Sequence, residues 1–157
     1  MKKVWWKVPL YCVVMGWLAY QAELRLLIRF AIVRLPDATV TINDMRSMIV
    51  SGILFAAILA VGGLIFFRRM SRKELLQSAT VMVGLNIVGG LVAYSTQGQF
   101  TMLYTEVIGW SNFVSKLLYQ IQMNQWISSI FVWAAPYLFV FFGKKAAKGE
   151  DDGIEPR

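Results

Sequence analysis

Histidine is absent from this 157-residue sequence, and Cys12 is its only cysteine. Without histidine the chain has no His-based catalytic triad and no imidazole proton relay. A zinc site built from cysteine and histidine is excluded too, because such a site takes about four of these ligands. One cysteine cannot form a disulfide within the chain, so cysteine usage does not indicate the redox compartment. Cys12 lies in an apolar stretch, and we expect a small buried residue there.

Acidic residues are also few, nine against sixteen Lys and Arg, which gives a formal charge of +7. No apolar segment holds two carboxylates at a metal-binding spacing. The sequence contains no Gly-rich phosphate loop, no G-x-S-x-G nucleophile motif and no H-E-x-x-H zinc motif. We therefore expect no cofactor and no metal, and we expect that the protein is not an enzyme.

Apolar residues, by contrast, make up 57 % of the chain and charged residues only 16 %. Soluble domains have roughly 45–50 % apolar residues. The basic residues gather at the ends of apolar runs, where they would meet anionic lipid headgroups, and are not spread over a polar surface. This pattern indicates an integral membrane protein and argues against nucleic-acid binding.

Four apolar stretches are long enough to cross a bilayer as helices, which takes roughly 20 residues. We expect these spans at about 4–24, 47–67, 75–94 and 126–142. Pro136 interrupts the fourth span and is expected to kink it. The spans form one membrane domain, residues 1–143, and the charged stretch 144–157 is expected to be a disordered cytoplasmic tail. The first span is expected to remain as an anchor, since cleavage after Ala19 or Ala22 would put a bulky aromatic residue three positions before the cut.

Polar residues before the apolar stretches predict where the helices begin. Ser71 and Glu74 have the S-x-x-E form of a capping box, in which two side chains satisfy orphaned amides at a helix start. Asn43 or Asp44 is expected to cap the second span, and Asn124 the fourth.

The segment 100–122, between the third and fourth spans, has a different pattern. Apolar residues recur along it every three or four positions while its other face is polar, which is typical of an amphipathic helix. A fifth crossing here would separate the basic residues of the tail from the other basic clusters. We therefore expect an interfacial helix, or two short ones broken near Gly109, at the outer membrane surface, with Trp110 in the outer aromatic belt. The predicted fold is an all-α bundle of four transmembrane helices, with this amphipathic helix between helices 3 and 4.

The distribution of basic residues predicts the orientation. Ten lysines and arginines lie near the helix ends on one side, and five lie on the other. Because cytoplasmic loops carry an excess of Lys and Arg, we expect both termini in the cytoplasm and the protein in a plasma membrane of the bacterial inner-membrane type. The loop between the second and third spans is expected to contact anionic lipid headgroups. Its basic residues are Arg68, Arg69, Arg72 and Lys73.

Two polar features in the spans are candidate ligand-binding positions. Gln21, Arg25 and Arg29 are four residues apart and share one face at the outer end of the first span, with Glu23 pointing away from them. That face would attract an anion or a lipid headgroup, or it would form a collar of long side chains that reach water. Asn86 lies near the middle of the third span, where an unpaired amide is costly. It either forms a plain hydrogen bond between helices or lines a path for a solute.

Small residues mark two faces on which another helix can approach closely. Lipid gives no hydrophobic drive for helix association, so small residues at every fourth position favour close backbone packing. The sequence leaves open whether these faces join helices within one subunit or join two copies in a homo-oligomer. The residues are Gly52, Ala56 and Ala60 on the second span, and Gly84, Gly89 and Gly90 on the third.

Two functional classes fit these expectations. The first is a non-catalytic accessory, scaffold or assembly subunit, which works through helix packing and lipid contacts with another membrane protein or a second copy. The alternative is a small oligomeric transporter or channel for a small solute or anion, with Asn86 and the Gln21/Arg25/Arg29 face lining its route. Few polar residues lie within the spans, which argues against a continuous hydrophilic path and favours the first class.

Overall fold

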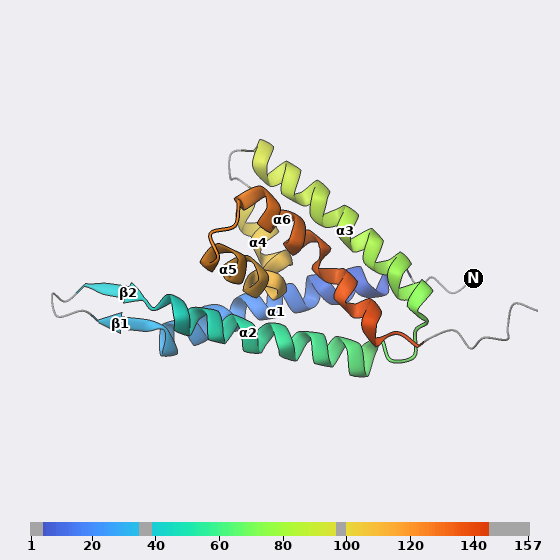
Figure 1. The fold of residues 1–157 in the computed structure, drawn as a ribbon, viewed down its shortest axis with the longest axis horizontal. Helices are drawn as coiled ribbons and strands as arrows, with labels where there is room; N and C mark the ends of the chain where they lie inside the picture. Colours follow the sequence, from blue (N-terminus) through green and yellow to red (C-terminus); the bar gives the residue numbers. More distant parts are fainter. Residues whose placement is uncertain (1–4, 35–38, 97–99, 145–157) are drawn as a thin grey trace, which may run out of the picture.

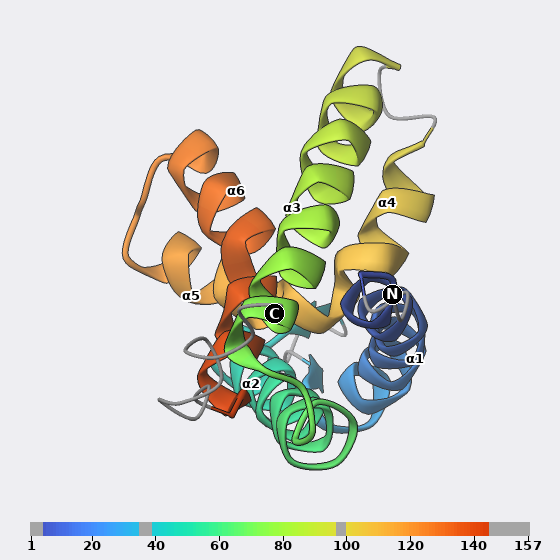
Figure 2. The ribbon, with the colours of Figure 1, turned by 90° about the vertical axis from the view of Figure 1, so that its right-hand side faces the viewer.

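A computed structural model describes residues 5–34, 39–96 and 100–144 of the chain. Within these ranges most residues are helical, and the first two helices, α1 and α2, run side by side along the long axis of the molecule (Figure 1). The start of α1 lies at one end of the molecule, and a small β hairpin extends from the opposite end (Figure 1). Viewed along this axis, α4 lies beside α1, while α5 and α6 lie on the other side of α3 (Figure 2).

The first helix, α1 (Lys7–Phe30), continues past the end of the predicted span. Leucine and arginine, both good helix formers, carry the helix through Arg25 and Arg29. It is followed by the C-cap residue Ala31, whose backbone N–H donates to the carbonyl of Leu27 at 3.0 Å. The additional turns place the two arginines on helix, at the hairpin end of the molecule.

Two short antiparallel strands, β1 (Ile32–Arg34) and β2 (Val40–Ile42), follow α1 and pair with Ile32 opposite Ile42. Five of the six strand residues are β-branched, a side-chain type that suits strands. The hairpin was not predicted, because strands of three residues are too short to show a period of two. Residues 35–38, between the two strands, lie outside the described residues.

The second helix, α2 (Asp44–Val61), begins where the sequence predicted. The side chain of Asn43 accepts a hydrogen bond from the backbone N–H of Arg46 at 3.0 Å, which makes Asn43 the cap. The helix continues into a π-helical turn, η1 (Gly62–Phe66). The third helix, α3 (Arg72–Ser95), starts with the predicted capping box. The Ser71 side chain accepts from the backbone N–H of Glu74 at 3.2 Å, and the Glu74 carboxylate accepts from the backbone N–H of Ser71 at 2.9 Å.

The segment between the third and fourth predicted spans consists of two short helices, α4 (Thr101–Ile108) and α5 (Asn112–Gln120). A 3-10 turn, η2 (Gly109–Ser111), separates them, so the break near Gly109 is confirmed. The turn packs into the bundle, and Trp110 is only 2 % exposed. The expectation that Trp110 belongs to an outer aromatic belt is therefore wrong.

Two glycines explain how this turn reaches the interior. A Cβ on Gly16 of α1 would overlap the backbone carbonyl of Val107, and one on Gly109 would lie 2.8 Å from the carbonyl oxygen of Gly16. Backbone therefore contacts backbone where α1 meets the end of α4. Only glycine allows this approach, because any side chain would push the two segments apart.

The last helix, α6 (Gln125–Ala134), is capped by Asn124, whose side chain accepts from the N–H of Trp126 at 2.9 Å. It changes into a 3-10 helix, η3 (Ala135–Phe142), whose second residue is Pro136. Proline has no N–H for the regular α-helical bond, so the change of helix type agrees with the predicted interruption.

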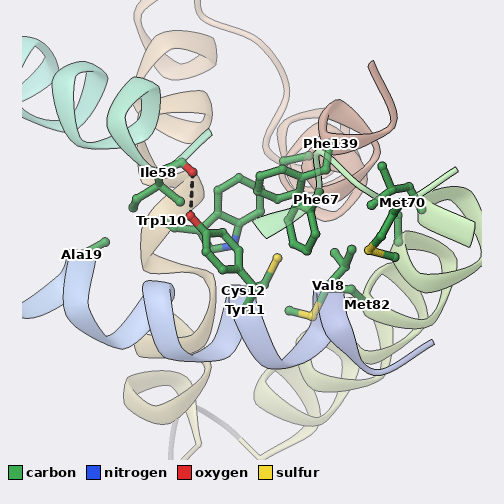
Figure 3. Packing of buried hydrophobic residues seen from close by; sticks show 13 residues of the cluster. Val8, Tyr11, Cys12, Ala19, Ile58, Phe67, Met70, Met82, Trp110 and Phe139 are labelled. Atoms are coloured by element: carbon green, nitrogen blue, oxygen red, sulfur yellow. Dashed lines mark hydrogen bonds between the residues drawn. The ribbon is translucent and has the colours of Figure 1, made fainter. Parts of the chain in front are cut away.

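An aromatic cluster fills the interior between the helices (Figure 3). Phe139 is its centre, with ring centroids 5.0 Å from Phe67 and 5.6 Å from both Tyr11 and Trp110. Cys12 lies in the same cluster and is fully buried, as predicted. The elements α1, η2 and η3 are thus held together by ring contacts, and the region they enclose is apolar.

Three helical stretches of the described chain are long and apolar enough to cross a membrane. They are Asp44–Phe66, Arg72–Ser95 and Gln125–Phe142, and an 18-residue window in each has a mean hydropathy of 2.6, 1.7 and 1.5 respectively. They correspond to the second, third and fourth predicted spans, and α1 is not among them. The fold is therefore that of a helical protein with three candidate membrane-spanning segments.

Candidate functional site: a buried ion pair

Glu23 of α1 is the most buried charged residue of the described chain, with 5 % of its surface exposed. Its carboxylate forms an ion pair with the ammonium group of Lys116 on α5. The hydroxyl of Ser51 donates to Oε1 at 2.5 Å, and the amide of Asn112 donates to Oε2 at 3.1 Å. Both carboxylate oxygens therefore have donors from other helices.

The ammonium group of Lys116 also has a hydrogen-bond partner for each of its donors. Its Nζ contacts Glu23, Ser47 Oγ at 2.8 Å and Ser51 Oγ at 2.8 Å, which uses all three ammonium donors. The two serines are four residues apart on α2, so their hydroxyl groups lie on one face of that helix. We name these residues the Glu23–Lys116 cluster. Its five members are Glu23, Ser47, Ser51, Asn112 and Lys116. It joins α1, α2 and α5.

The cluster lies close to the hairpin end of the bundle. Its serines occupy the first two turns of α2, roughly 5–10 Å from the start of that helix at 1.5 Å per residue. Removing charges from water is costly and is offset only where the pair is well hydrogen-bonded. The Lys116 side chain remains 32 % exposed, so water screens the pair from one side.

Two cavities adjoin the cluster. One, of about 230 Å³, is lined by Ser47 and Lys116 and also by Asp44 and Ser115. The other, of about 490 Å³, lies among α3, α4, α5 and α6 and is lined by Asn112 and Ser115. Because Ser115 lines both cavities and Asn112 touches Glu23, the ion pair stands between two partly polar spaces.

No protein-family model, no curated protein and no solved structure matches this chain. Within the described ranges, His, Cys, Asp and Glu side chains form no group of three or more that could hold a metal ion.

Asn86, a predicted ligand-binding residue, lies away from the cluster. It is 3 % exposed, and its Nδ2 donates to the backbone carbonyl of Trp133 on α6 at 3.3 Å. Its Oδ1 is buried and has no hydrogen-bond partner among the described residues. The amide thus forms the interhelical hydrogen bond that was one of its two interpretations.

The Gln21/Arg25/Arg29 face does not join the cluster either. Gln21 is half-buried, and the two arginines are exposed at the end of α1. Glu23 points away from this face, as the spacing predicted, and its side chain enters the bundle. The arginines were predicted from the sequence as candidates, and the ion pair was not. One signal was available, because a carboxylate in an apolar helix needs a cation and Lys116 was the one cation on the amphipathic segment.

Three of the predicted packing residues contact aromatic rings of neighbouring elements. A Cβ on Gly52 would lie 3.0 Å from a ring on α5, one on Gly89 would lie 3.1 Å from a ring on α4, and one on Gly90 would lie 2.8 Å from a ring on α6. These glycines therefore make room for side chains within the subunit.

The other three lie on surfaces that the described chain leaves open. Ala56 and Ala60 are exposed on α2. A Cβ on Gly84 would meet nothing within 4 Å. Small residues on these two faces are therefore not explained by packing inside the described chain.

The basic stretch 68–73, which leads from η1 into the first two residues of α3, lies at the end of the molecule opposite the hairpin (Figure 1). All four of its basic residues are exposed, which leaves their charges open to solvent or lipid headgroups. Arg72 also serves within the fold, because its Nε donates to the carbonyl of Gly143 at 3.3 Å. The four residues are Arg68, Arg69, Arg72 and Lys73.

Proposed function

We propose that α1 is a fourth membrane span and that both termini face the cytoplasm of a bacterial-type inner membrane. With 24 residues α1 extends about 36 Å, more than the roughly 30 Å of a hydrocarbon core. Its buried charge, Glu23, is neutralised by Lys116. Its exposed arginines, Arg25 and Arg29, lie near its end, where long side chains reach water.

On this framework the function that we propose is the binding and transport of a small polar or charged solute. The observation that carries the proposal is the charged pair inside the bundle, between two cavities. Ionisable residues inside membrane proteins usually line solute or ion pathways. The broken segment α4–η2–α5 supports the same interpretation, since an interrupted helix at membrane depth is tolerated where it lines a cavity or is buried in protein.

The hydrogen bonds of the cluster indicate which solutes would compete for it. Every donor of Lys116 is occupied, so a charged solute must displace a partner in order to bind. An amine would compete for Glu23, a carboxylate would compete for Lys116, and a zwitterion would engage both. Opening the ion pair is then the step that admits the solute.

The aromatic cluster would close the route on the side of the termini. Tyr11, Phe67, Trp110 and Phe139 fill the bundle beyond the ion pair, and a polar solute gains no hydrogen bonds from most of this surface. Transport therefore requires these rings to separate. Four helices enclose little volume, and we expect a homodimer to supply the remaining walls.

Uptake into liposomes tests the proposal, with labelled glycine, acetate and methylammonium as the zwitterionic, anionic and cationic probes. We expect uptake of at least one probe above protein-free liposomes, and its loss in Glu23→Gln. Glu106→Gln is the matched control, since Glu106 belongs to neighbouring α4 and has no part in the ion pair. Absence of uptake of all three probes by folded wild-type protein would contradict the transport proposal.

A second candidate function is a non-catalytic accessory, scaffold or assembly subunit. The observation that favours it is the set of small residues left uncovered on α2 and α3, Ala56, Ala60 and Gly84. Such faces accept a helix of another membrane protein. Purification in mild detergent separates the two candidates, because a stoichiometric partner supports the accessory role and a homodimer with solute uptake supports transport.

A further inference from the structure

An apolar groove of about 530 Å³ lies between α1 and α2 at the hairpin end of the molecule. It is separate from the Glu23–Lys116 cluster and shares no lining residue with either cavity beside that cluster. Five bulky apolar side chains and one arginine form it. They are Leu26, Phe30, Arg46, Ile49, Val50 and Ile53.

The groove has a charged residue at one end and apolar side chains along its walls. Arg46, Ile49, Val50 and Ile53 follow the i, i+3, i+4, i+7 spacing of one helix face. Arg46 is the first of them, in the opening turn of α2, and Ile53 lies about 10 Å further along the helix at 1.5 Å per residue. Charge at the helix end followed by apolar surface toward the middle of the helix is the profile of an amphiphile standing in one leaflet.

The arginines at this end have no carboxylate to neutralise them within the described chain. The ion pair of Glu23 with Lys116 is the one salt bridge found in the described ranges, and it uses neither Arg25, Arg29 nor Arg46. A second hollow lined by Arg25 and Arg29 adjoins the groove, because Leu26 lines both. Arg46 therefore lines the charged end of the groove, and Arg25 and Arg29 line the hollow beside it.

We propose that this groove binds one anionic phospholipid, with an acyl chain along the apolar walls and the phosphate held by Arg46, Arg25 and Arg29. Arginine presents a fork of N–H donors that matches phosphate oxygens. The apolar walls favour an acyl chain over a partner helix, because close helix packing in membranes uses small residues and these walls are Leu, Ile, Val and Phe. The proposal does not depend on solute transport.

Lipid binding by the full-length protein in detergent micelles tests it. Phosphatidylglycerol and phosphatidylcholine with identical acyl chains are compared by native mass spectrometry. We expect phosphatidylglycerol to bind more tightly, and Arg46→Gln to weaken it roughly fivefold, the effect of one basic residue at an anionic membrane surface. The substitution leaves the start of α2 intact, since the Asn43 cap uses only the backbone N–H of residue 46.

Matched variants locate the acyl chain. Ile53→Trp fills the groove and is expected to reduce phosphatidylglycerol binding, whereas Ile65→Trp, at an equally exposed position on η1, leaves it unchanged. Arg69→Gln, in the loop at the other end of the molecule, is the charge control. Equal binding of the two lipids, or equal effects of the two tryptophans, would overturn the proposal. A phosphatidylglycerol with a photoreactive acyl chain gives a second measurement, and crosslinks spread evenly over the helices would also overturn it.

Discussion

At the scale of single residues, the pairing of Glu23 with Lys116 determines the free-energy cost of placing charges inside the bundle. Each neutralises the other, and the hydroxyl and amide groups around them satisfy what remains. Loss of one partner leaves a charge in the bundle without its counterion, whereas loss of both removes the desolvation cost as well. The pair is therefore best probed by comparing single and double replacements.

We expect Glu23→Gln to lower the free energy of unfolding by roughly 1–3 kcal/mol, less than a fully buried pair would lose, because Lys116 is partly exposed. Adding Lys116→Met is expected to recover much of this loss, because it removes the unpaired ammonium. Denaturant unfolding in detergent measures both. A double variant less stable than Glu23→Gln by more than about 1 kcal/mol would contradict the electrostatic explanation.

Asn86 behaves differently, because one of its two polar atoms has no partner in the described chain. Asn86→Leu removes one long hydrogen bond to α6 together with a buried, unsatisfied acceptor. We expect stability to remain unchanged or to rise by up to about 1 kcal/mol. Thermal unfolding in detergent tests this, and a loss above about 2 kcal/mol would show that the amide makes a contact essential to the fold.

At the scale of elements, the broken segment α4–η2–α5 organises the site, because α5 contributes Lys116 and Asn112 to the cluster. Its position depends on backbone contact between Gly16 and the end of α4. The side chain of Trp110 then enters the aromatic cluster and stacks on Phe55, with centroids 5.8 Å apart. One close approach of two backbones thus determines where the cation of the ion pair lies.

Gly16→Ala is expected to destabilise the protein by roughly 1–3 kcal/mol, because the added methyl overlaps backbone that cannot move aside. Gly84→Ala is the matched control. Its methyl meets open space, and replacing a helical glycine by alanine is expected to stabilise α3 by about 1 kcal/mol. Melting temperatures should therefore move in opposite directions. A shift of the same sign in both variants would contradict the close approach.

The start of α3 depends on its capping box. Ser71→Ala is expected to cost roughly 0.5–2 kcal/mol, because it removes the acceptor for the Glu74 N–H. Ser95→Ala, at the other end of the same helix, is expected to have almost no effect, since its hydroxyl only bonds back to a carbonyl of its own helix. Equal melting temperatures for Ser71→Ala and wild type would count against the cap.

At the scale of the whole molecule, the charged residues gather at the two ends. The basic stretch 68–73, from the loop after η1 into the start of α3, carries four exposed basic residues, whereas the hairpin end carries the groove arginines and the ion pair. If the long axis of the molecule crosses the membrane, the hairpin lies outside and the basic loop lies in the cytoplasm. The solute site and the lipid groove would then both belong to the outer half of the bilayer.

Cysteine labelling in intact cells tests this orientation in a Cys12→Ser background. We expect an impermeant thiol reagent to label a cysteine that replaces Thr41 in the hairpin and to spare one that replaces Arg69 in the basic loop. Losing one arginine leaves nine basic residues against five, so the charge asymmetry that sets the orientation persists. The reverse labelling pattern would invert the proposed topology.

The sequence by itself determined the features that depend on neighbours within a few residues. The caps at Asn43, Ser71 and Asn124 follow from side chains that reach amides two or three positions away. The apolar lengths of three helical stretches and the break near Gly109 were readable for the same reason.

Only the tertiary structure decided the buried position of Trp110, the hairpin after α1 and the pairing of Glu23 with Lys116. Glu23 and Lys116 are 93 positions apart, and no local sequence pattern indicates which cation pairs with a buried carboxylate. Which cation pairs with Glu23 depends on how closely α1 and the end of α4 approach. This approach in turn depends on a glycine in each contacting segment. Packing at a distance in sequence, and not helix propensity, therefore created the candidate site.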